Sequence, residues 1–113
     1  MRIIDGATPL TEFELMAREG FGNLVKAVVD TEREIMAVDG ELHADEEALL
    51  LDNGSRQQHL WGINIYPELS WPERVEFDSM INIRPSQGNR SRGVDRPEIR
   101  ERIIQIVQKL VTP

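Results

Sequence analysis

The chain has 113 residues, which suits a single domain over 1–113, and its 40% hydrophobic and 29% charged residues are ordinary for a globular protein. It contains no cysteine, which excludes disulfides, thiolate catalysis and cysteine-based zinc sites. No stretch approaches the ~20 apolar residues needed to cross a bilayer, and the start of the chain lacks a signal-peptide pattern. We therefore expect a cytoplasmic protein that does not contact membranes.

The formal net charge of −7 is spread unevenly along the chain. Residues 30–52, the acidic zone, hold nine carboxylates and Arg33 as the one basic residue. Residues 84–102, the basic zone, hold six arginines and three carboxylates. Arginine forks suit planar carboxylates and phosphates. Aromatic residues are only 5% of the chain, so stacking platforms are scarce and we do not expect nucleic-acid binding.

The first predicted element is a helix that begins at the Thr8–Pro9 pair, because threonine can cap free N–H groups and proline fits a first turn. Thr11 and Glu14 offer a competing capping box. Apolar residues follow with a helical period. Gly20 or Gly22 is expected to end this helix, since glycine accepts the left-handed geometry of a helix end.

Several segments have the composition of strands. The β-branched segment 24–30 and the segment 34–38 predict a hairpin across a short turn, and 1–5 predicts an added edge strand. Residues 60–66 predict a further strand. The regular alternation of apolar and polar residues over 74–84 predicts the clearest strand of the chain.

Residues 44–53 are compatible with two structures. The acidic residues Asp45, Glu46 and Glu47 favour a helix, because negative charge is stabilising at a helix N-terminus. A short strand over 49–51 followed by a tight turn is the alternative. We prefer the helix, since only a helix gives the acidic first turn a physical purpose.

The last predicted helix spans about 97–111. Asp95 and Glu98 predict a capping box with Pro97 in the first turn, and a stripe of isoleucine, valine and leucine makes the helix amphipathic. Strands joined by short turns, with about three helices, predict an α+β domain of two layers. In that arrangement a mainly antiparallel sheet carries its helices on one face.

The segment between the last strand and the last helix is the candidate binding site. Loops of this length in compact domains are usually functional or disordered, and this one ends at a helix N-terminus that can receive an anion. The expected ligand contacts are Arg84, Asn89, Arg90 and Arg92. Asp78 and Asn82 are expected to orient the arginines or the ligand. The alternative is that the loop arginines are structural and bind the acidic zone.

Polar residues also gather on the predicted strands. If 60–66 and 74–84 pair, then Asn64, Asp78 and Asn82 share one surface with Arg84. Such residues are rarely buried without partners, so this face is expected to be open or to form a polar floor beside the loop.

A metal site is weighed around His43, Asp45, Glu46 and Glu47, with His59 as the one other histidine. The spacing matches no established ligand motif, so a solvated helix start is preferred and no metal ligand is assigned. His43 could act with a neighbouring glutamate in acid–base chemistry, but no nucleophile accompanies it. Whether the protein is an enzyme, and which cofactor it uses, is left open.

Long runs of the sequence resemble a small prokaryotic protein family of unknown function. They include GELHADEEALLLDNGS, LWGINIYPE and DSMINIRPSQGNRSRG, and the resemblance covers nearly the whole chain. It implies a stand-alone cytoplasmic domain and transfers no activity or site residue.

From the residues, the preferred function is a regulatory or ligand-binding domain for a small anion, held by the 84–96 loop. The first alternative is a homo-oligomeric interaction module, a homodimer in which the acidic zone of one subunit meets the basic zone of another. A weaker alternative is a metal-dependent enzyme that uses His43 and nearby carboxylates.

Overall fold

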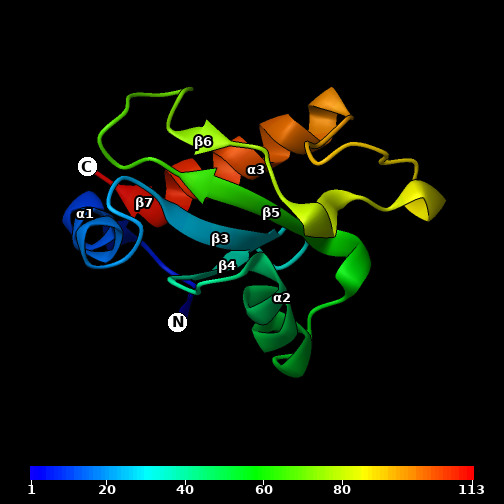
Figure 1. The fold of residues 1–113 in the computed structure, drawn as a ribbon, viewed down its shortest axis with the longest axis horizontal. Helices are drawn as coiled ribbons and strands as arrows, with labels where there is room; N and C mark the ends of the chain where they lie inside the picture. The colour runs from blue at the N-terminus through cyan, green and yellow to red at the C-terminus, as the bar shows by residue number, and fades with distance from the viewer.

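A computed structural model describes residues 1–113 and places a five-stranded sheet at the centre of the protein (Figure 1). The sheet order is β1-β4-β3-β5-β6, and every neighbouring pair is antiparallel. Its strands are β1 (Arg2–Ile4), β3 (Val25–Asp30), β4 (Ile35–Val38), β5 (Leu60–Ile65) and β6 (Val75–Glu76). Two short strands, β2 (Thr8–Pro9) and β7 (Val111–Thr112), pair in parallel apart from the main sheet.

Three α-helices accompany the sheet: α1 (Leu10–Glu19), α2 (His43–Asp52) and α3 (Pro97–Leu110). Short 3-10 turns lie at Gln57–His59, Met80–Asn82 and Pro85–Gln87. The α+β fold with a mainly antiparallel sheet and a C-terminal helix is confirmed. So are the β3–β4 hairpin, the edge strand at the N-terminus, and the helical alternative for 44–53. None of the three helices combines the length and apolar character needed to cross a membrane.

The turn between β3 and β4 is held by the last residue of β3. The Asp30 carboxylate accepts hydrogen bonds from the backbone N–H groups of Glu32 and Arg33 at 2.9 and 3.0 Å. An aspartate that binds the backbone two residues ahead stabilises a turn. This contact fixes the register in which Ala27 faces Val38, and with it the position of every side chain along the hairpin.

The larger hydrophobic core lies between the sheet and the helices α1 and α3. Alternate residues of β3 and β5, including Ala27, Val29 and Ile63, pack against Phe13 of α1 and Ile103 of α3. These side chains are fully buried. The amphipathic stripe of α3 therefore covers the sheet face that its pattern requires.

A smaller core lies on the opposite face of the sheet, where α2 packs. Leu50 of α2 contacts Val28 of β3 and Leu60 of β5 there. Figure 1 shows α2 and α3 on opposite sides of the sheet. The fold therefore has three layers where the sequence predicted two. The prediction that all helices lie on one face of the sheet is wrong. The ten-residue α2 leaves part of its face of the sheet uncovered.

The long strand predicted over 74–84 is wrong, because β6 ends after Glu76. The chain then leaves the sheet edge. In place of a neighbouring strand, the Asn82 side-chain amide hydrogen-bonds to the backbone of β5. Its Oδ1 accepts from the Gly62 N–H at 2.8 Å and its Nδ2 donates to the Gly62 carbonyl at 2.9 Å. The alternation of apolar and polar residues arises here from a folded-back segment, which packs Ser79 and Ile81 against Gly62.

The predicted helix caps are also wrong. No side chain caps the N-terminus of α1 or α3. Thr8 donates its hydroxyl hydrogen bond to the Gly6 carbonyl. Asp95 accepts hydrogen bonds from the Ser91 hydroxyl and from the Arg90 backbone N–H. The side chains predicted to cap the helices therefore make hydrogen bonds within the preceding loops.

Candidate functional site

The uncovered part of the sheet beside α2 forms a groove of about 360 Å³, here called the polar groove. Lys26 of β3 and Asn64 of β5 form its floor and are direct cross-strand partners. The start of α2, with His43, makes one wall. The folded-back segment from Asp78 to Ile81, together with Arg92, makes the other. Elements far apart in the sequence therefore supply this site.

Two of the six predicted site residues lie in the polar groove. The Arg92 guanidinium contacts the Asp78 carboxylate, with Nε 2.6 Å from Oδ1. Both side chains remain about half exposed, so the pair is held in place and is still open to solvent. Arg92 keeps its terminal nitrogens free for a ligand, since the hydrogen bond to Asp78 uses Nε.

His43, the first residue of α2, is buried, and its imidazole ring is uncharged at neutral pH. Its Nε2 lies 2.8 Å from the Ile63 carbonyl oxygen. Burial lowers the pKa of His43, and the nearby Lys26 and Arg92 act in the same direction, whereas the Ile63 carbonyl and Asp78 oppose the shift. The histidine that the sequence placed in a metal or acid–base role therefore presents a neutral ring to the groove.

Asn64, on the floor of the groove, has an unpaired acceptor that is sealed from solvent. The residue is only 7% exposed, and its Nδ2 donates to Glu76 Oε1 at 2.8 Å. Because a carboxylate oxygen can only accept, this contact fixes which end of the amide is nitrogen. Asn64 Oδ1 is left with no hydrogen-bond partner. An unpaired buried acceptor costs about 1–3 kcal/mol, which makes Asn64 an unusual residue in this structure.

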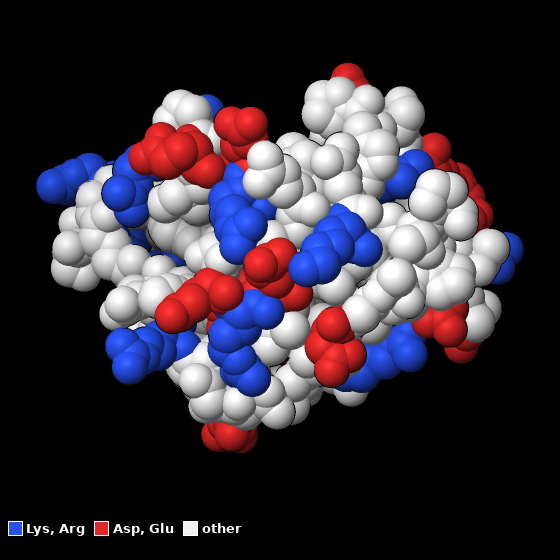
Figure 2. All heavy atoms as spheres, turned by 180° about the vertical axis from the view of Figure 1, so that it is seen from behind, with Lys and Arg blue, Asp and Glu red and all other residues white.

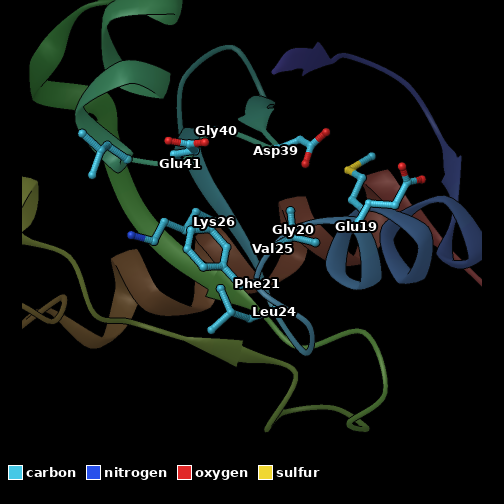
Figure 3. Close-up of a pocket in the computed structure, with 11 residues that line it drawn as sticks. Glu19, Gly20, Phe21, Leu24, Val25, Lys26, Asp39, Gly40 and Glu41 are labelled. Atoms are coloured by element: carbon cyan, nitrogen blue, oxygen red, sulfur yellow. The ribbon is translucent and has the colours of Figure 1, made fainter.

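A second hollow of about 510 Å³ adjoins the polar groove and shares Lys26 and Leu42 with it. Figure 3 shows the Lys26 side chain extending beside the Phe21 ring and away from Asp39. The Lys26 Nζ lies 5.0 Å from the centre of that ring, within the range of a cation–π contact. The remaining lining of this hollow mixes apolar side chains with the carboxylates of Glu19, Asp39 and Glu41, so the hollow is acidic where the polar groove is basic.

Glu46 lies beneath the adjoining hollow and is completely buried. Its Oε2 accepts from the Gly40 N–H at 2.9 Å, while Oε1 has no partner. Burial raises the pKa of Glu46 to about 9, which keeps the carboxyl protonated at neutral pH. The acidic first turn of α2 is thus part solvated and part core, because Glu46 points into the protein and Asp45 into solvent.

Three of the other predicted site residues bind the protein's own backbone. Asn82 holds Gly62 as described, and Asn89 Nδ2 donates to the carbonyls of Asn82, Ser91 and Gly93. Arg84 lies over Trp61, 4.3 Å from the ring centre. Its two terminal nitrogens donate to the carbonyls of Gln57 and Leu60. The side-chain amides of Asn82 and Asn89 have no hydrogen-bonding capacity left over for a ligand's phosphate oxygens.

Arg90, the sixth predicted site residue, is exposed on the loop before α3. Its backbone N–H donates to Asp95 at 2.9 Å, and its side chain makes no hydrogen bond within the protein. The hydrogen bond from the Ser91 hydroxyl, ahead of that from Arg90, holds the pKa of Asp95 below its usual range. The Asp95 carboxylate therefore binds within the loop itself, and anion binding by the Arg90 side chain stays a prediction.

The residues considered for a metal site do not converge. No group of three or more histidine, aspartate and glutamate side chains comes together to hold a metal ion. His59 lies beside Glu32, with Nδ1 3.1 Å from Oε2, far in sequence from His43, which binds Ile63. The two histidines thus have separate contacts in the fold.

The acidic and basic zones are partly paired within one chain. Glu34 of the acidic zone lies 3.3 Å from Arg102 of the basic zone and 3.1 Å from Lys109. The hydrogen bond from Lys109, followed by its charge and by Arg102, lowers the pKa of Glu34. On the face seen in Figure 2, acidic and basic side chains alternate and do not form separate patches. A subunit contact between two charged zones stays a prediction.

The sequence interpretation missed Lys26 as a site residue. Lys26 is the one basic residue within the β-branched segment 25–30, and it is half-buried where every other residue of β3 is buried. A charged residue at an inward-alternating position of a strand is the signal that could have singled it out. Its pairing with Asn64 depends on the register of β3 and β5, which the sequence does not encode locally.

Comparison with known proteins gives one match. A family model described as "Protein of unknown function (DUF5674)" matches residues 2–110, which is nearly the whole chain. Neither the curated proteins nor the solved structures contain a significant match.

Proposed function

The chain belongs to the DUF5674 family of proteins of unknown function, and from that premise we propose that it is a binding domain for a small organic anion. The ligand occupies the polar groove, which includes Asp78 and Arg92 of the residues predicted from the sequence. The observation that carries the proposal is the convergence of Lys26, Arg92 and the start of α2 on one groove.

The start of α2 adds positive potential to the groove. The residue before the helix is Leu42, whose side chain cannot cap the first N–H groups, and no side-chain cap is present. Uncapped N–H groups at a helix start carry partial positive charge and bind anions. His43 and Ala44, the first two helical residues, both line the groove.

The balance of formal charges also favours an anion. Lys26 and Arg92 contribute two positive charges, and Asp78 offsets one of them while it orients Arg92. Because His43 is neutral at physiological pH, the groove carries one net positive charge in a protein whose formal net charge is −7. Such a site attracts a small anion locally, against the field of the whole molecule.

The test is thermal stabilisation of the protein by phosphate, succinate and malate at constant ionic strength, followed by titration calorimetry of any anion that raises Tm. Lys26→Gln and Arg92→Gln each remove one positive charge from the groove, and we expect each to weaken binding at least tenfold.

Arg90→Gln is the matched control. It removes the same charge from the same loop as Arg92→Gln, but Arg90 does not line the groove. We expect this variant to bind as the wild type does. Loss of binding in Arg90→Gln with retention in Lys26→Gln would place the anion at the loop before α3. No stabilisation by any of the anions would refute the proposal.

A further inference from the structure

The polar groove contains acceptors as well as cations, and this combination restricts the ligand. An anion alone would satisfy Lys26, Arg92 and the start of α2. It would offer nothing to His43 Nδ1, an acceptor on a residue that lines the same groove.

The tautomer of His43 follows from its single hydrogen bond. The Ile63 carbonyl oxygen 2.8 Å from Nε2 can only accept, so Nε2 must carry the hydrogen. In a neutral ring the other nitrogen, Nδ1, then has a lone pair and no hydrogen. Nδ1 makes no hydrogen bond within the protein, and it is not among the polar atoms sealed off from solvent. His43 thus presents a fixed acceptor to whatever enters the groove.

The charged groups around His43 come from three parts of the fold. Lys26 projects from β3, while Asp78 and Arg92 come from the segment that follows β6. Asp78 accepts a hydrogen bond from Arg92 through Oδ1 alone, so its Oδ2 can also accept from a ligand. Asn64 Oδ1 is sealed from solvent, which leaves His43 Nδ1 as the neutral unpaired acceptor that a ligand in the groove can reach.

We propose that the ligand is a small organic anion that carries a hydroxyl or amino hydrogen-bond donor beside its anionic group, and that His43 Nδ1 accepts this hydrogen bond. The proposal rests on the anion-binding function of the polar groove and narrows its ligand class. Lys26 and Arg92 hold the anionic group, while the donor faces the imidazole. A site with an unpaired acceptor rejects an analogue that lacks the donor, because that analogue leaves the acceptor unpaired and without water.

Succinate and malate test the proposal directly, because they differ by one hydroxyl group. We expect the wild type to bind malate at least tenfold more tightly than succinate in titration calorimetry at pH 7.5. His43→Gln is the informative variant, since the glutamine amide can still donate to the Ile63 carbonyl but has no counterpart of Nδ1. In this variant we expect malate to bind no better than succinate.

The pH dependence of the wild type provides a second test that needs no variant. When the pH falls through the titration of His43, Nδ1 gains a proton and becomes a donor. Malate should then lose its advantage over succinate, while both anions gain the attraction of the added positive charge. A malate-to-succinate affinity ratio that falls with the pH supports the proposal.

Different results would overturn the ligand class proposed here and the anion-binding function on which it rests. Equal binding of malate and succinate by the wild type at pH 7.5 would overturn this inference and leave anion binding in the groove intact. A malate-to-succinate affinity ratio that stays constant with pH would overturn it as well. Binding of neither succinate, malate nor phosphate would remove the proposed function and the inference together.

Discussion

Glu46→Gln tests whether the buried carboxyl of α2 is protonated in the folded protein. Glutamine has nearly the same shape as a protonated glutamate, and its carbonyl oxygen can keep the hydrogen bond from the Gly40 N–H. The substitution therefore removes a titrating group from the core with little change in packing. Its effect on stability should depend on pH.

The sign of that dependence follows from the two pKa values. The Glu46 carboxyl ionises near its ordinary value of 4.5 in the unfolded chain and near a pKa of about 9 in the folded protein. Between these values the unfolded chain binds fewer protons, so the contribution of Glu46 to folding is complete below pH 4.5 and is lost as the pH rises toward 9.

The size of the stability difference follows from the interval between the two pKa values of Glu46. Each pH unit within it lowers the free energy of unfolding of the wild type by about 1.4 kcal/mol relative to Glu46→Gln. From pH 5 to pH 8 the difference between the two proteins should therefore grow by ~4 kcal/mol in favour of the variant. Other titrating groups are common to both proteins and cancel in this difference.

Urea denaturation followed by tryptophan fluorescence measures the effect, because Trp61 is buried in the core. Asp45→Asn, which removes an exposed carboxylate from the same helix, is the control and should show no comparable growth with pH. A difference between Glu46→Gln and wild type that stays constant from pH 5 to pH 8 would refute the argument that Glu46 is protonated in the fold.

Two further substitutions test how the segment after β6 is held against the sheet edge. Asn82→Ala leaves the Gly62 N–H and carbonyl without their partners. We expect urea denaturation to show a loss of about 2–4 kcal/mol in the free energy of unfolding. A loss below ~0.5 kcal/mol would show that the sheet edge does not need this amide. Gly62→Ala places a methyl group 2.5 Å from Ser79 Cβ and should destabilise by about 1–3 kcal/mol. Ser79→Gly in the same chain should recover part of that loss, and the absence of any recovery would mean that the strain lies elsewhere.

Elements with a strong local pattern are predicted correctly from the sequence. The amphipathic stripe of α3 and the β-branched hairpin of β3 and β4 each describe one buried face, and burial on one face is what a helical or strand period records. The strand expected over 74–84 is wrong because such a pattern records which side chains are buried, not which backbone conformation buries them. The segment after Glu76 packs back on Gly62 and does not continue β6.

The candidate site is predictable only in part. Asp78 and Arg92 are singled out by their position in a polar, arginine-rich segment, and they do line the groove. The other loop residues resemble binding groups in the sequence, but Asn82, Asn89 and Arg84 donate their side-chain hydrogen bonds to backbone carbonyls. Nothing in a linear sequence distinguishes an amide that faces a ligand from one that holds a loop together.

The sequence by itself determined the α+β class, the position of the three helices and most strands, and the presence of an arginine-rich segment near the C-terminal helix. Only the tertiary structure decided which polar residues share a surface. Lys26 meets Asn64 through the register of β3 and β5, and His43 meets both because α2 packs on that face of the sheet. Strand register and helix packing are long-range properties, so they assemble the polar groove from residues whose local sequence contains no sign of one another.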